Sequence, residues 1–75
     1  DISRDDVKNC LSQGEMIEDY PDDFPHPSCL IFGHTIDNKV IHVVVGCDHE
    51  YIYIITAYFP NRVKFEADLK TRRVN

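Results

Sequence analysis

The spacing of hydrophobic residues along this 75-residue chain changes once, from a helical to an extended pattern. Residues 2–15 predict a short amphipathic helix. Its apolar side chains recur at intervals of three and four residues: Val7, Cys10 and Leu11. Ser3 is a good N-cap, and Asp6 can replace the glutamate of a capping box, although less effectively. Gly14 predicts a left-handed C-cap that ends this helix.

The rest of the pattern predicts extended chain. Three apolar runs rich in β-branched and aromatic residues predict antiparallel strands: 28–35, 39–47 and 51–59. Residues 15–20 predict a weaker strand at one edge, followed by a proline-rich loop. Pro60 ends the last strand, and the following residues predict a short helix capped by Asn61, or a tail. The predicted fold class is therefore α+β, with an N-terminal helix, a three- to four-stranded antiparallel meander and a short C-terminal helix or tail.

His42 lies between two apolar runs of the middle strand. A two-residue turn at Asp37-Asn38 would place it opposite Gly33. A three-residue loop at 48–50 would place it opposite Thr56, with Tyr58 diagonal to it on the same face. The predicted set is then His42, Thr56 and Tyr58. The structural alternative, which these residues favour over catalysis, is a His42 ring hydrogen-bonded to Thr56 or to a backbone carbonyl.

Charge is spread unevenly over the chain, whose formal net charge is −5. Residues 1–27 carry eight acids and two bases, whereas residues 60–75 carry five bases and two acids. The overall acidity disfavours non-specific nucleic-acid binding, which depends on neutralising phosphates. The basic C-terminal segment can still bind a single phosphate group, or the two ends of the chain can attract each other or stay solvated.

The cysteine count predicts reduced thiols and a cytoplasmic location. Three cysteines without short spacing do not form a disulfide scaffold: Cys10, Cys29 and Cys47. The pairs His26/Cys29 and Cys47/His49 lack the spacing of a structural zinc site, so no metal is predicted. The three glycines form no phosphate-binding loop, and no cofactor is predicted. No apolar run approaches the ~20 residues that span a membrane, so no membrane partner is expected.

Four segments in this order resemble the prokaryotic family called domain of unknown function 4258: GEMIEDYPDDFPHPSCLIFG, VIHVVVGCD, IYIITAYFP and FEADLKTRR. The combination of His-Val-Val with Ile-Thr-x-Tyr-x-Pro is the most specific part of this resemblance. Phe65 replaces the tryptophan that the family often has near its end. The family also begins with a further helix, so we expect residues 1–75 to be a single domain that lacks this upstream helix.

The layout of the family is similar to that of the barnase–colicin–RelE group of small ribonucleases, many of which are toxins. The resemblance implies a toxin-like ribonuclease with RNA and an antitoxin-like protein as partners. The implied catalytic residues are His42 as general acid or base, Thr56 and Tyr58 to position the phosphate, and Lys64 to stabilise charge. The implied binding residues are Arg62, Arg72 and Arg73.

A second hypothesis is a non-catalytic interaction module. The middle strand is apolar on both faces, so a partner can cover one of them. The net acidity also fits a protein partner better than RNA. This hypothesis predicts a homodimer or a complex with an antitoxin-like protein, and the residues alone do not decide whether the chain is an enzyme.

Overall fold

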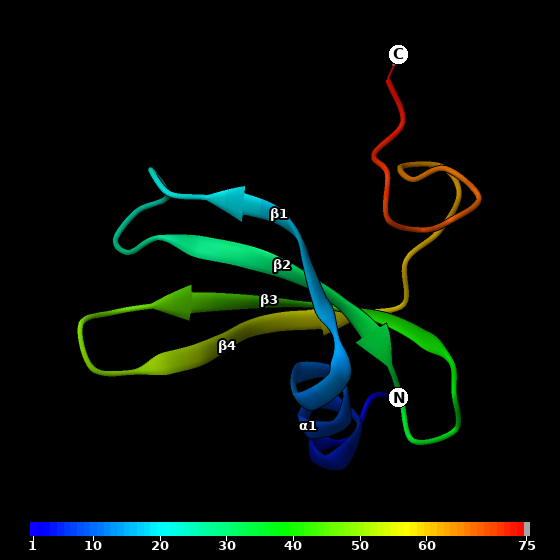
Figure 1. The fold of residues 1–75 in the computed structure, drawn as a ribbon, viewed down its shortest axis with the longest axis horizontal. Coiled ribbons are helices and arrows are strands. Elements are labelled where there is room, and N and C mark those ends of the chain that lie inside the picture. Colours follow the sequence, from blue (N-terminus) through cyan, green and yellow to red (C-terminus); the bar gives the residue numbers. More distant parts are fainter. Residues whose placement is uncertain (75) are drawn as a thin grey trace.

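The computed structural model describes residues 1–74 as one helix and a four-stranded antiparallel sheet (Figure 1). The elements are α1 (Arg4–Gln13), β1 (Glu15–Tyr20), β2 (Ser28–His34), β3 (Val40–Cys47) and β4 (Ile52–Tyr58). The strands pair in the order β1-β2-β3-β4, which is a meander. The predicted α+β fold is confirmed, including the edge strand at 15–20. The one helix in residues 1–74 is too short to cross a membrane.

Helix α1 begins as predicted and ends differently. The Asp6 amide donates to Ser3 Oγ over 3.1 Å, and the Ser3 amide donates to Asp6 Oδ2 over 3.0 Å, which completes a capping box. The left-handed C-cap is wrong, because Gly14 is extended, with φ −85° and ψ 179°. A glycine is required there for a different reason. A Cβ at residue 14 would lie 2.5 Å from the Phe32 carbonyl oxygen as the chain turns directly into β1.

The register between β2 and β3 differs by one residue from the prediction. His42 pairs with Phe32, and its predicted partner Gly33 pairs with the neighbouring residue of β3. The turn holds three residues rather than two, and the third of them, Asn38, has a φ of 66°. The Thr35 amide donates to the Lys39 carbonyl over 2.8 Å and closes the hairpin. A left-handed residue in the third position is typical of three-residue hairpins.

The register between β3 and β4 differs by two residues. His42 pairs with Tyr58, and Val44 pairs with Thr56. The loop is one residue shorter than predicted, because the Asp48 amide donates to the Tyr51 carbonyl and encloses only two residues. A β-bulge between Val44 and Val45 shifts the register further. Tyr58 and Thr56 therefore exchange places: Tyr58 lies directly opposite His42 and Thr56 lies diagonal to it.

Both faces of β3 are buried, as its apolar sequence predicts. The core on the first face consists of Cys10 from α1 and three residues of β3: Ile41, Val43 and Val45. On the second face, Leu30, His42 and Phe65 are each no more than 2% exposed. This second face is covered by the chain's own C-terminal segment, residues 59–74, which we call the hook. Figure 1 shows α1 and the hook at opposite sides of the sheet.

The hook is irregular, so the predicted C-terminal helix does not form and the alternative of a tail holds. Asn61 Oδ1 accepts from the amides of Val63 and Lys64, which gives a single turn. The chain then reverses, because Asp68 Oδ1 accepts from the amides of Lys70 and Thr71, and Phe65 forms an isolated bridge with Arg72. Asn and Asp side chains compete in this way with helical hydrogen bonds.

Candidate functional site

His42 is fully buried and hydrogen-bonded through both ring nitrogens. Its Nε2 lies 2.6 Å from the Leu69 carbonyl oxygen, and its Nδ1 lies 3.3 Å from Tyr58 Oη. A carbonyl oxygen only accepts, so Nε2 carries the proton of the neutral ring. Nδ1 then accepts from the phenol of Tyr58. Of the two partners predicted for a structural histidine, the backbone carbonyl is the one that the structure provides.

Aromatic side chains enclose the His42 ring. The Phe65 ring packs edge-on against it with the centroids 4.6 Å apart, and the Phe32 centroid lies at 6.1 Å. Burial lowers the pKa of His42, opposed by the hydrogen bond to Leu69 and by the charge of Glu18. The ring is therefore neutral at neutral pH and can accept a proton only transiently. Burial also raises the pKa of the Tyr58 phenol, which keeps it protonated.

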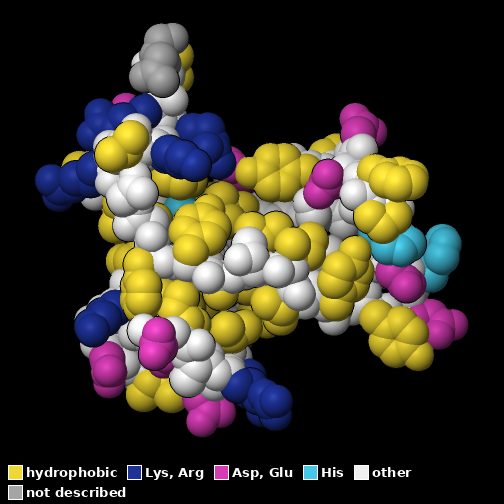
Figure 2. Space-filling view, turned by 180° about the vertical axis from the view of Figure 1, so that it is seen from behind, with side chains coloured by type: hydrophobic (Ala, Val, Ile, Leu, Met, Phe, Trp, Pro, Cys, Tyr) yellow, Lys and Arg dark blue, Asp and Glu magenta, His cyan; other side chains and the backbone are white. Residues whose placement is uncertain are grey.

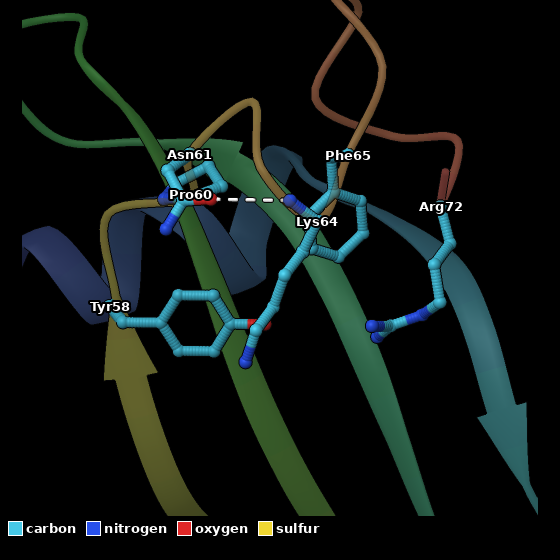
Figure 3. A pocket seen from close by; sticks show the side chains of 6 residues that line it. All are labelled: Tyr58, Pro60, Asn61, Lys64, Phe65 and Arg72. Atoms are coloured by element: carbon cyan, nitrogen blue, oxygen red, sulfur yellow. Dashed lines mark hydrogen bonds between the residues drawn. The ribbon is translucent and has the colours of Figure 1, made fainter. Parts of the chain in front are cut away.

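A pocket of about 250 Å³ lies between the end of β4 and the hook. Its lining residues are Tyr58, Pro60, Asn61, Lys64, Phe65 and Arg72. Figure 3 shows the phenol of Tyr58 and the guanidinium of Arg72 directed toward each other, with the Lys64 side chain descending between them. The pocket thus combines one hydroxyl with two cations, and His42 lies behind the hydroxyl.

Arg72 is held in place by β1. Its Nε donates to Glu18 Oε2 over 3.0 Å and its Nη2 donates to Glu18 Oε1 over 2.9 Å. Its guanidinium carbon lies 4.8 Å from the centroid of the Phe65 ring, in a cation–π contact. The hydrogen bonds from Arg72 lower the pKa of Glu18. A second ion pair, Lys70 to Glu15 at 2.6 Å, joins the hook to the same strand.

The structure brings together some of the predicted site residues. Tyr58, Lys64 and Arg72 line the pocket, and Arg73 joins Lys64 and Arg72 in an adjoining hollow. Figure 2 shows Lys and Arg side chains gathered around the C-terminal segment. Thr56 is exposed on β4 and lines neither hollow. Arg62 lies in the hook, where its carbonyl accepts from Arg73 Nε.

Three residues of this arrangement were not predicted as parts of a site. Asn61 was recognised only as a cap, and Phe65 only as the residue in place of a family tryptophan. Glu18 lies in β1 and reaches Arg72 across 54 sequence positions. No local pattern connects residues so distant, although the acidic residues in 1–27 and the basic residues in 60–75 had made attraction between the two ends one of the alternatives.

A protein-family model described as Domain of unknown function (DUF4258) matches residues 1–59. The chain belongs to the DUF4258 family. Searches of curated proteins and of solved structures give no significant match. The DUF4258 match covers α1 and the sheet and ends where the hook begins. Tyr58 is therefore inside the matched region, whereas Lys64 and Arg72 lie beyond it.

Substitution Glu18→Gln is expected to loosen the hook without unfolding the sheet. The change removes the charge that holds Arg72, and partly exposed ion pairs of this kind contribute about 1 kcal/mol or less. The expected result is faster amide hydrogen exchange at Glu66 and Arg73, whose amides bond within the hook. Exchange in β3 should stay unchanged. Uniformly faster exchange in both regions would contradict a local role for this ion pair.

Proposed function

We propose that this domain binds a phosphodiester of RNA in the pocket and cleaves it, as a small toxin-like ribonuclease. The observation that carries the proposal is the convergence of the Tyr58 hydroxyl, Lys64 and Arg72 on one pocket, with His42 hydrogen-bonded behind the hydroxyl. This set differs from the one implied by the sequence, since Tyr58 rather than His42 faces the substrate and Thr56 takes no part.

The charges of the pocket suit one phosphate. Lys64 makes no ion pair with another residue of the described chain, so its ammonium group is available to an anion. Arg72 is oriented by Glu18, and a guanidinium held in this way binds a phosphate with little further loss of side-chain entropy. The two cations would stabilise the charge that develops on the phosphate oxygens during cleavage.

The hydrogen-bonded chain from Leu69 through His42 to Tyr58 supplies a route for a proton. The 2′-hydroxyl of RNA gives its proton to Tyr58 Oη while the phenol proton passes to His42 Nδ1. The 2′-oxygen then bonds to phosphorus, and the bond to the 5′-oxygen breaks. That oxygen takes a proton from water, and the hydroxide that remains is neutralised by the proton that His42 returns through the Tyr58 phenol. The products are a 2′,3′-cyclic phosphate and a 5′-hydroxyl, so DNA of the same sequence should stay intact.

The test is cleavage of an end-labelled RNA by the wild type and by Tyr58→Phe, which keeps the ring and removes the hydroxyl. We expect the variant to lose about 100-fold or more in rate, as when a general base is removed. The matched control is Thr56→Val, an exposed position on the same strand that lies outside the pocket. A wild type that cuts no RNA, or a Tyr58→Phe variant as active as the wild type, would refute the proposal.

A second function, association with another protein, is supported by a separate observation. Strand β4 forms one edge of the sheet and leaves large apolar side chains exposed there. An exposed apolar edge strand of this kind tends to pair with another chain.

A further inference from the structure

The two edges of the sheet are protected very differently. Strand β1 forms one edge and carries three acids: Glu15, Glu18 and Asp19. Two of these acids are paired with residues of the hook, which covers part of that edge. Strand β4 forms the other edge, and residues 51–59 contain no charged residue at all. Charged side chains are a common protection against edge-to-edge pairing, and the β4 edge lacks them.

The side chains along the β4 edge are large, apolar and exposed. Six of them are at least 38% exposed: Tyr51, Ile52, Tyr53, Ile54, Ile55 and Phe59. Helix α1 packs mainly on β2 and β3, which leaves the outer strand with less cover. Figure 2 shows hydrophobic side chains extending across the middle of one face of the molecule. The combined exposed area is roughly 600 Å² per copy, at the upper limit for the apolar patch of a monomer.

We propose that two copies of this chain associate through β4, with the two strands antiparallel about a twofold axis. The result is one continuous sheet of eight strands, four from each copy. The pairing uses residues 51–54. Beyond Ile54, the β-bulge opposite Val44 and Val45 of β3 interrupts the regular geometry of β4. Backbone amides and carbonyls on the free side of this segment bond to the same groups of the second copy.

Charge favours a second copy as the occupant of this edge. Two chains with a net charge of −5 repel each other, so they can associate closely only where no like charges meet. At β4 a twofold axis brings uncharged residues against their own counterparts. A twofold axis placed at β1 would instead bring Glu15, Glu18 and Asp19 close to the same acids of the second copy. The exposed apolar area along β4, roughly 600 Å² per copy, is at the low end for specific protein–protein interfaces, and the hydrogen bonds between the two strands add to it.

This dimer leaves the pocket accessible. Tyr58 lies at the far end of β4 from the proposed pairing segment, and the other pocket residues belong to the hook. The proposal therefore stands on different residues from the proposed ribonuclease, and either can fail without the other.

The test is sedimentation of the purified chain over a wide range of concentrations. We expect the wild type to have twice the 8.7 kDa mass of one chain. Ile52→Lys places a charge in the pairing segment at a side chain that is 71% exposed, and the variant is expected to sediment as a monomer. The matched control is Met16→Lys, which adds the same charge at a 57% exposed side chain on the opposite edge and should leave the dimer intact.

Folding of each variant is checked by far-ultraviolet circular dichroism, so that loss of the dimer is separated from loss of the sheet. Nuclear Overhauser effects between labelled and unlabelled copies should connect backbone protons of Tyr53 with the β4 strand of the other copy. A wild type that is monomeric at every concentration would overturn the proposal. So would an Ile52→Lys variant that stays dimeric, a Met16→Lys variant that dissociates, or intermolecular contacts confined to another surface.

Discussion

Replacing Gly33 with alanine is expected to destabilise the protein by about 2–3 kcal/mol, even though alanine is the better strand residue. Gly33 lies on the face of β2 that α1 covers. An added Cβ would be 2.6 Å from Cys10 Sγ and 2.9 Å from Cys10 Cα. The second distance involves the helix backbone, so α1 itself must move away from the sheet. Since a domain of this size has a total stability of about 5 kcal/mol, the urea midpoint should fall steeply.

Gly46→Ala provides the matched control. A Cβ there would lie 2.7 Å from the Tyr53 hydroxyl, but that side chain is partly exposed and can rotate away. The loss of stability should be clearly smaller than for Gly33→Ala. Adding Cys10→Ala to Gly33→Ala removes the sulfur contact and leaves the backbone contact, so it should restore only part of the loss. Equal effects of the two glycine substitutions would contradict the close approach of α1 to β2.

Lowering the pH below about 6.5 is expected to destabilise the fold through His42. Its pKa is lowered by burial, so the unfolded chain binds a proton at a pH where the folded chain does not. Stability from the neutral ring is therefore complete above the unfolded pKa and is lost as the pH falls toward the folded pKa. The slope cannot exceed about 1.4 kcal/mol per pH unit for one group. Acids with lowered pKa values, such as Glu18, contribute only at lower pH, near and below 4.5.

The measurement is urea unfolding of the wild type and of His42→Gln at a series of pH values between 7 and 5. Glutamine has no titrating group, so the variant should lose this part of the pH dependence even if it is less stable overall. Nitrogen chemical shifts of the His42 ring should also show a proton on Nε2 throughout this range. Identical slopes for the two proteins would show that His42 is not the group responsible.

The order and type of the elements could be predicted because each depends on local spacing. The apolar face of α1, its capping box and the four strands each depend on residues that lie close together in the sequence. The registers could not be predicted, because each depends on one residue in a turn or a bulge. Asn38 adopting a positive φ and the bulge beside Val45 together moved His42 away from both of its predicted partners.

The site was predictable in part for a similar reason. Tyr58 was placed on the correct face by strand alternation, and the basic residues of the hook were recognised from composition. The burial of His42 was not predictable, because it depends on how Phe65 folds back over the sheet. A helix at the C-terminal end would have carried Phe65 on a regular face, whereas the turns at Asn61 and Asp68 carry it to His42 instead.

The meander also determines when each part of the protein can form during synthesis. Each strand after β1 pairs with the strand translated just before it, so the sheet can assemble as the chain leaves the ribosome. The hook is the exception, because Arg72 must return to Glu18 across 54 positions. The pocket is consequently the last feature to be completed. A nascent chain that stalls after β4 contains all four strands but neither of the pocket's cations.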